Sequence, residues 1–96
     1  MRVDLSRRAI ADIYRIADNF QYPAAARRTE HEIRRTLKLL GEFPGTGKFR
    51  PHLNAYVAIV RVRRRSYLIY YRFFADTMIV SHIRDGRRAP VKPGEV

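Results

Sequence analysis

The chain has 96 residues, with 20 Lys and Arg against nine Asp and Glu, a formal net charge of +11, and no cysteine. This length supports a single domain, 1–96, and excludes a second one, while the absence of cysteine excludes disulfides and thiolate metal sites. Seventeen of the 20 cations are arginines, whose planar guanidinium groups favour carboxylate or phosphate, so an acidic protein or a nucleic acid is the expected partner.

The N-terminal sequence MRVDLSRRA contains no apolar signal core. The longest strongly apolar run, residues 55–60, is too short to cross a bilayer. We therefore expect a cytoplasmic protein that has no contact with a membrane.

The first half of the chain predicts one short strand and two helices. Polar and apolar residues alternate over residues 2–5, and Ser6 is a favourable N-cap for the first helix. Asp12 falls among the charged residues that the helical spacing assigns to the solvent side of that helix. Pro23 fits the first turn of the second helix, and Gly41 is predicted to end it. Two amphipathic helices joined by a few residues predict a helical hairpin that packs on a sheet.

The second half of the chain predicts an irregular connection followed by three strands rich in aromatic and β-branched residues. The predicted segments are a connection over 43–52, strands over 56–62, 67–74 and 78–83, and turns at 63–65 and 75–77. Residues 89–96, with two prolines, are expected to form an irregular tail. The predicted order is β-α-α-β-β-β, an α+β fold whose N-terminal strand and helical hairpin pack on one face of a small antiparallel sheet.

Strand parity predicts a second sheet face that is apolar in the middle and basic at its margin. Alternate residues of a strand point to opposite sides, and on the last strand Ile79, Ser81 and Ile83 are assigned to the helix side. No sequence remains to cover the other side, so we expect a partner chain there, the alternative being the C-terminal tail. The residues expected to bind this partner are Ile59, Arg61, Leu68, Tyr70, Arg72, Met78 and Val80.

The last predicted strand ends in three arginines around an Asp-Gly turn signal. We expect Arg84, Arg87 and Arg88 to leave the sheet together and to form the surface that binds the macromolecule on which this protein acts. The alternative is a structural role, in which Arg84 or Arg87 pairs with Asp85 or with Asp12 of the first helix.

Ordinary motifs for metal binding and catalysis are absent from the sequence. The three histidines lack metal-ligand spacing, and no Gly-rich loop opens a helix, so we expect no metal and no cofactor. One enzymatic alternative stays open, because metal-free RNA cleavage needs an acid, a base and fixed cations, which His82, Arg61 and Arg88 could partly supply. A single histidine on a strand is more often structural, so a binding protein is favoured over an enzyme.

Several segments together resemble the RelE/ParE superfamily of toxins from bacterial type II toxin-antitoxin systems. They are ADI in the first helix, YPAAA opening the second, the connection LLGEFPGTG, YLIYYR on the central strand and IRDGRR closing the last strand. The pattern is more similar to the ParE branch than to the RelE branch. The resemblance implies a small toxin neutralised by an acidic or amphipathic antitoxin, which would occupy the open sheet face. For the ParE branch it also implies DNA gyrase as the target.

The sequence departs from both branches of the superfamily. RelE-type ribonucleases carry a basic residue where this chain has Leu68 and a tyrosine beyond the terminal arginine, whereas the tail past Arg88 contains none. Only Arg61 and Arg88 match the basic positions of that branch. Against the ParE pattern, Arg65-Ser66 replaces the usual glycine before the central strand, and Asp85 precedes the terminal Gly-Arg-Arg. Two hypotheses therefore stay open, a gyrase-binding toxin and, as the alternative, a RelE-like ribosome-dependent mRNA endoribonuclease.

Overall fold

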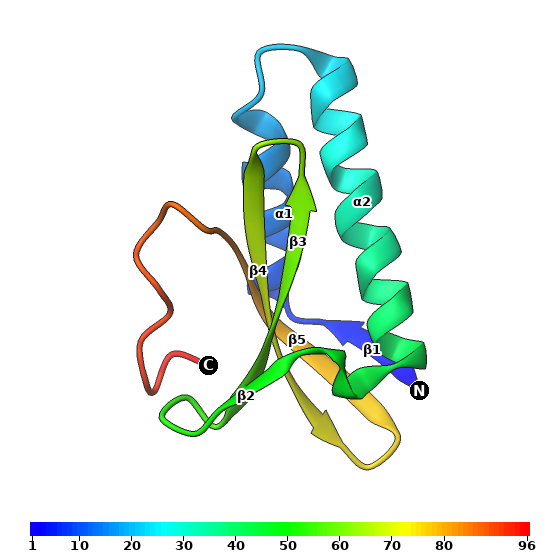
Figure 1. Ribbon diagram of the computed structural model, residues 1–96, viewed down its shortest axis with the longest axis vertical. Helices are drawn as coiled ribbons and strands as arrows, with labels where there is room; N and C mark the ends of the chain where they lie inside the picture. Colours follow the sequence, from blue (N-terminus) through cyan, green and yellow to red (C-terminus); the bar gives the residue numbers. More distant parts are fainter.

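The computed structural model describes all 96 residues as two α-helices and one five-stranded sheet (Figure 1). The elements are β1 (Arg2–Leu5), α1 (Arg7–Asp18), α2 (Pro23–Glu42), the 3-10 helix η1 (Pro44–Thr46), β2 (Lys48–Arg50), β3 (Ala55–Val62), β4 (Arg65–Phe74) and β5 (Thr77–Asp85). Neither helix combines the length and the apolar character that a membrane crossing requires. The predicted α+β fold, with a helical hairpin on a mostly antiparallel sheet, is confirmed.

Two differences from the predicted topology lie at the edges of the sheet, whose strand order is β1-β5-β4-β3-β2. The segment predicted as irregular contains β2, which pairs antiparallel with the start of β3. All three residues of β2 are exposed, so no apolar alternation marks this strand in the sequence. At the other edge, β1 runs parallel to β5. A strand of four residues reveals neither its partner nor its direction before the fold is known.

Local signals set most helix boundaries as predicted. The Ser6 hydroxyl oxygen accepts a hydrogen bond from the Ala9 N–H at 3.0 Å, so Ser6 caps α1, and Pro23 lies in the first turn of α2. Gly41 does not end α2, which continues to Glu42. A Cβ atom at Gly41 would lie 2.8 Å from Cγ2 of Val3, so the glycine allows β1 to pack closely against α2.

The main hydrophobic core lies between the helical hairpin and the sheet face that the helices cover, here called the inner face (Figure 1). The helices contribute buried residues at helical spacing, and β3, β4 and β5 contribute alternate residues. The core residues are Ala9, Ile13, Ile16, Ile33, Leu37, Leu40, Ala58, Val60, Val62, Tyr67, Ile69, Tyr71, Met78, Val80 and Ile83.

A β-bulge in β5 changes which side chains of this strand face the core. The pairing of β5 with β4 skips Ser81, and the extra residue shifts the side-chain alternation by one position. Met78 and Val80 therefore point inward and are fully buried, whereas Ile79 is 43% exposed. The predicted positions of Met78 and Val80 on the open face, and of Ile79 on the helix side, are wrong for this reason.

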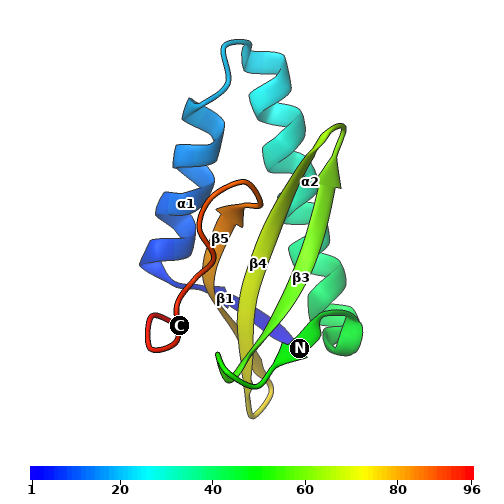
Figure 2. The ribbon, with the colours of Figure 1, turned by 60° about the vertical axis from the view of Figure 1, so that its left-hand side comes forward.

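The C-terminal segment 89–96 contains neither helix nor strand, yet it packs on the sheet face opposite the helices, here called the outer face (Figure 2). Val91 is buried there in a second cluster with Leu53, Ala55 and Tyr70. The tail therefore covers part of the face that was predicted to be open, and only the rest is available to a partner chain.

The bulge predicts opposite results for two neighbouring residues of β5. Met78→Ala should lower the free energy of unfolding by about 2 to 5 kcal/mol, because it leaves a cavity in the core. Ile79→Ala should cost less than about 1 kcal/mol, because that side chain is largely exposed. Urea unfolding of both variants measures the difference, and a larger loss for Ile79→Ala would contradict the assigned faces.

Candidate functional site

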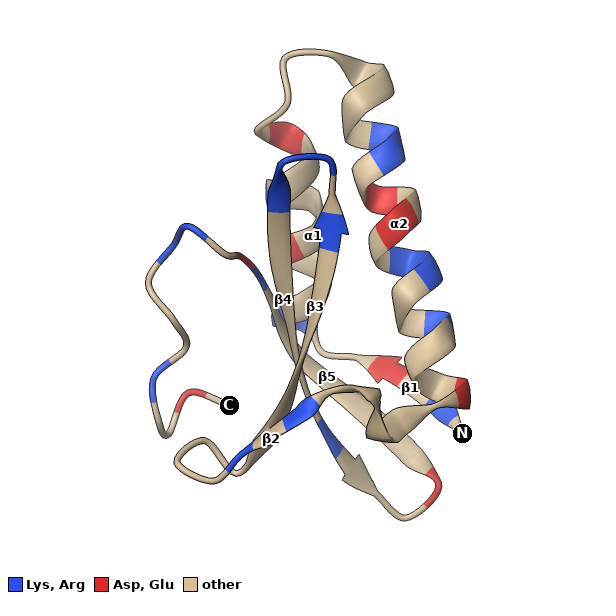
Figure 3. Cartoon of the chain, viewed as in Figure 1, with Lys and Arg blue, Asp and Glu red and all other residues tan.

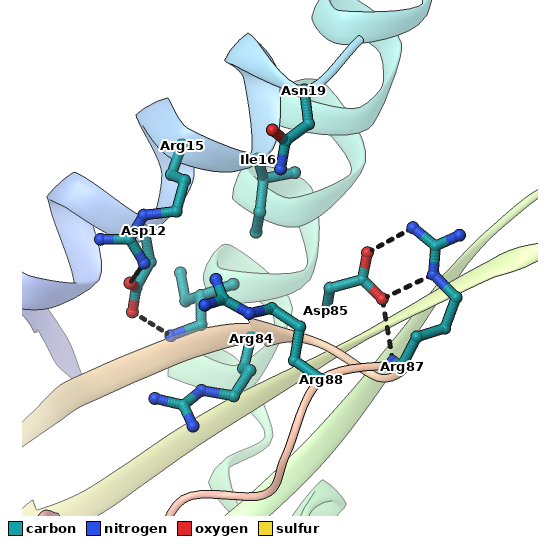
Figure 4. A pocket seen from close by; sticks show the side chains of 9 residues that line it. Asp12, Arg15, Ile16, Asn19, Arg84, Asp85, Arg87 and Arg88 are labelled. Atoms are coloured by element: carbon teal, nitrogen blue, oxygen red, sulfur yellow. Dashed lines mark hydrogen bonds and ion pairs between the residues drawn. The ribbon is translucent and has the colours of Figure 1, made fainter.

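A basic pocket lies between the C-terminal half of α1 and the end of β5 (Figure 4). It has a volume of about 370 Å³, and its lining contains four arginines and two aspartates. We call it the arginine pocket; its lining residues are Asp12, Arg15, Ile16, Asn19, Ile83, Arg84, Asp85, Arg87 and Arg88. The pocket brings together the three arginines predicted to bind the target, and it adds Arg15, which sequence reasoning did not include.

The arginines at the end of β5 differ in their partners. The Arg87 guanidinium donates to the Asp85 carboxylate through Nη2 at 2.9 Å and through Nε at 3.2 Å (Figure 4). These hydrogen bonds hold the pKa of Asp85 below its usual range. Arg84 donates from Nη1 to the Ala89 carbonyl at 2.9 Å. The Arg88 side chain is exposed and makes no hydrogen bond or ion pair, so it is free to bind an anion.

The inner wall of the arginine pocket is held by the buried carboxylate of Asp12, which is 3% exposed. One oxygen accepts a hydrogen bond from the Ile83 N–H at 3.0 Å. The other accepts from Nε of Arg8 at 3.0 Å and from Nη1 of Arg15 at 3.2 Å. This carboxylate joins α1 to β5 and orients Arg15, so the pocket has a fixed wall.

The assignment of Asp12 to the solvent side of α1 is wrong, because β5 needs a hydrogen-bond acceptor at this position. Strand β1 pairs with β5 only as far as Val80, so no strand accepts a hydrogen bond from the Ile83 N–H. Arg8 and Arg15 lie four residues before and three after Asp12. Two arginines at this spacing around one aspartate, beside the apolar stripe, are the signal that could have indicated a buried ion-paired carboxylate.

The alternative pairing proposed for the terminal arginines holds for one pair only. Arg87 binds Asp85, whereas Asp12 binds Arg8 and Arg15 and makes no ion pair with Arg84 or Arg87.

The outer face carries a groove beside the tail, with a volume of about 320 Å³. We call it the outer groove; its lining residues are Lys48, Arg50, His52, Leu53, Val57, Ile59, Leu68, Tyr70, Pro90 and Val91. Of the residues predicted to bind the antitoxin, Ile59 is 56% exposed and Leu68 is half-buried, so both can be reached from solvent. Arg61 is also exposed, on the same strand as Ile59.

Two other predicted antitoxin contacts have structural partners. Tyr70 lies in the second cluster with the tail and is buried, so it cannot be reached without moving Val91. The Arg72 guanidinium donates to three carbonyl groups, those of Leu53 at 3.1 Å, Asn54 at 2.7 Å and Val96 at 3.0 Å. Arg72 thus ties the loop before β3 and the tail to the sheet.

The three residues of the ribonuclease hypothesis lie in different surroundings. His82 is only 6% exposed, and its Nδ1 atom has no hydrogen-bond partner. Burial, reinforced by the positive charge of Arg8, lowers the pKa of His82. Arg61 is exposed on β3, and Arg88 lines the arginine pocket. No cavity has two of these three residues in its lining.

A family model described as the ParE toxin of the type II toxin-antitoxin system, parDE, matches residues 3–90. The chain belongs to the ParE toxin family. This match confirms the resemblance to the RelE/ParE superfamily and the identification of the chain as a toxin of a type II toxin-antitoxin system. No curated protein matches the sequence.

Two solved structures share the fold of this ParE-family toxin. A chromosomal ParDE TA system from P. aeruginosa superposes with a TM-score of 0.69 at 20% identity, covering 88% of this chain and 95% of that one. The intact E. coli RelBE toxin-antitoxin complex superposes with a TM-score of 0.61 at 15% identity, covering 91% of this chain and 98% of that one. At these identities the likeness concerns the fold alone.

The buried imidazole predicts how the stability of this ParE-family toxin depends on pH. Because the pKa of His82 is lower in the folded protein than in the unfolded chain, its contribution is fully favourable above about pH 6.5. As the pH falls below that value, the unfolded state takes up the proton first and the free energy of unfolding decreases. His82→Leu should flatten this fall, measured by urea unfolding between about pH 7.5 and 5.5.

The matched control is His31→Gln, which removes an exposed histidine of α2 in place of the buried one. An unaltered pH dependence in His82→Leu would contradict the burial of the imidazole as its cause.

Proposed function

We propose that this ParE-family toxin arrests growth by binding DNA gyrase through the arginine pocket, without cleaving RNA. The observation that carries this proposal is the Arg88 guanidinium, which is exposed and unpaired beside Arg15, Arg84 and Arg87. A planar guanidinium can bind a carboxylate or a phosphate through two hydrogen bonds. An anionic group of the target that enters the pocket would therefore find a free arginine and three further positive charges.

The rigidity of the arginine pocket supports a binding role. Asp85 fixes Arg87, and the Ala89 carbonyl fixes Arg84, so both side chains are ordered before a target arrives. Preorganised groups lose less conformational entropy on association, which raises affinity. The pocket is small and open to solvent at Arg88, a geometry suited to gripping one anionic group on a protein surface.

The state of His82 argues against the ribonuclease alternative. A general acid must be protonated and must reach the leaving oxygen. His82 is buried and its pKa is lowered, so at neutral pH the imidazole is neutral and shielded from a substrate. The only free terminal arginine, Arg88, lines the arginine pocket, and His82 is not in the lining of that pocket. Both observations favour inhibition by binding.

A double substitution separates target binding from folding. Arg87→Ala with Arg88→Ala should cost under about 1 kcal/mol in unfolding free energy, because both arginine side chains are largely exposed. The same variant should lose growth arrest and the inhibition of supercoiling by purified gyrase. Thermal melting, growth curves and a supercoiling assay provide the measurements.

The control for this variant is Arg34→Ala with Arg35→Ala, which removes the same charge from ion-paired positions on α2 and should keep toxicity. A fall in stability proportional to the loss of toxicity would assign the terminal arginines to the fold. Cleavage of mRNA on the ribosome by the purified toxin, with gyrase unaffected, would establish the RelE-like alternative.

We further propose that the antitoxin binds the outer groove. Ile59 and Leu68 are opposed on neighbouring strands and offer an accessible apolar surface, and Lys48 and Arg50 lie at its rim. Apolar burial stabilises such a complex by about 25 cal/mol per Å², and the cations would attract an acidic chain and speed its association. An acidic amphipathic segment fits this combination of groups.

A charge placed in the outer groove tests this assignment. Ile59→Asp should abolish co-purification with the cognate antitoxin, because it buries an unpaired carboxylate in the interface. Leu39→Asp is the control, since Leu39 is comparably exposed on α2 and lies outside the groove. Retention of the antitoxin by Ile59→Asp at wild-type affinity would rule out the outer groove.

A further inference from the structure

A second group of arginines lies at the turn between β3 and β4, next to the end of β5 that carries the arginine pocket. Figure 3 shows basic residues on both strands and on the turn itself, beside the N-terminal half of α2. A cleft of about 420 Å³ separates this turn from α2, and four arginines but no carboxylate line it. The lining residues are Phe20, Ala25, Arg28, Thr29, Val62, Arg63, Arg64 and Arg65. We call Arg28 and Arg63–Arg65 the arginine tip.

The turn between β3 and β4 holds an arginine in a backbone conformation that favours glycine. Arg63 and Arg64 alone connect the two strands, and Arg63 has φ = +58°. A positive φ at the first central residue of a two-residue hairpin turn favours glycine, because a side chain there crowds the backbone. A positively charged side chain is therefore kept at a position where it costs stability, which is typical of functional residues.

The charge of the arginine tip is not neutralised within the fold. The side chains of Arg28, Arg63 and Arg64 make no hydrogen bond or ion pair. The nearby α2 carboxylates are already engaged, Glu30 by Arg34 at 3.0 Å and Glu32 by Arg35 at 3.4 Å. The tip therefore presents uncompensated positive charge to solvent.

Arginines outnumber apolar side chains in the lining of the cleft. Val62 is buried in the main core, and the half-buried Phe20 ring faces the Arg65 guanidinium, whose carbon lies 4.9 Å from the ring centroid. Closely spaced free guanidinium groups suit a row of phosphates, because each guanidinium can bind one phosphate through two hydrogen bonds.

We propose that the arginine tip binds the phosphate backbone of duplex DNA, so that this toxin contacts both gyrase and the DNA that gyrase acts on. The choice of duplex DNA as the phosphate source rests on the proposed function. A contact made to phosphates alone is independent of base sequence.

Salt dependence measures how many phosphates the tip contacts. We would titrate the purified toxin, without gyrase, against a short fluorescent DNA duplex at several salt concentrations. Arg63→Ala with Arg64→Ala should reduce the slope of log affinity against log salt by about 2, since each phosphate contact contributes roughly 0.9. Arg7→Ala with Lys38→Ala, which removes the same charge from exposed, unpaired positions outside the cleft, should leave the slope unchanged. An equal effect of both variants would overturn the proposal.

A glycine substitution separates charge from structure at the same residue. Arg63→Gly should raise the melting midpoint, because it relieves the positive φ, and should still weaken binding to DNA. Ala75→Gly is the matched control: Ala75 has φ = +55° in the β4–β5 turn, so it should raise the melting midpoint and leave DNA binding unchanged. A lower melting midpoint in Arg63→Gly would mean that the arginine serves the fold.

Binding measurements with other anionic ligands distinguish duplex DNA from the other possible partners of the arginine tip. Binding of a polyglutamate peptide as tightly as duplex DNA would overturn the proposal, and tighter binding of duplex RNA would reject DNA as the source of the phosphates. Inhibition of gyrase by a toxin that does not bind DNA would refute a role of the tip and leave the proposed function standing. DNA binding without gyrase inhibition would instead leave the tip's affinity for phosphate and remove the proposed target.

Discussion

The unpaired edge of β5 is the constraint on which the fold and the arginine pocket both depend. Strand β1 pairs with β5 only as far as Val80, and each buried backbone group left without a partner beyond that point would cost about 1 to 3 kcal/mol. Helix α1 supplies the missing partners: the Ser6 hydroxyl donates to the Ser81 carbonyl at 2.8 Å, and Asp12 accepts from the Ile83 N–H. These bonds hold α1 beside the end of β5, and the same Asp12 carboxylate orients Arg15 at the pocket. The Asp12 carboxylate therefore satisfies the edge of β5 and also positions one arginine of the candidate target site.

The bulge at Ser81 determines which side chains of β5 face the core and which face the outer side of the sheet. It turns the first half of β5 inward and places His82 opposite Tyr70 on the outer face, where the imidazole is buried. Two arginine clusters, the arginine pocket and the arginine tip, lie at the paired ends of β5 and β4, while the outer groove carries apolar residues on β3 and β4. The tail connects two of these surfaces, because Ala89 binds Arg84 at the pocket and Val91 packs beside the groove.

Much of the architecture could be predicted from local signals, since Ser6 and Pro23 mark helix starts and the aromatic runs mark β4 and β5. The assignment of side chains to the two sheet faces failed at the bulge in β5. Counting alternate residues assumes an unbroken strand, whereas the extra residue at Ser81 is specified by the pairing with β4. The buried role of Asp12 depends on where β1 stops, and the cover on Tyr70 depends on where the tail folds back. Both are set by tertiary contacts between segments distant in sequence. The three terminal arginines could be predicted as a group because one turn carries them, whereas Arg15 comes from another element.

Hydrogen–deuterium exchange of the toxin, alone and with DNA-bound gyrase, locates the binding surface without altering a residue. We expect slower exchange over residues 84–88 at the arginine pocket and over 63–65 at the arginine tip, with β2 and the outer groove unchanged. Protection confined to the outer groove, or no protection by gyrase at any segment, would contradict this expectation.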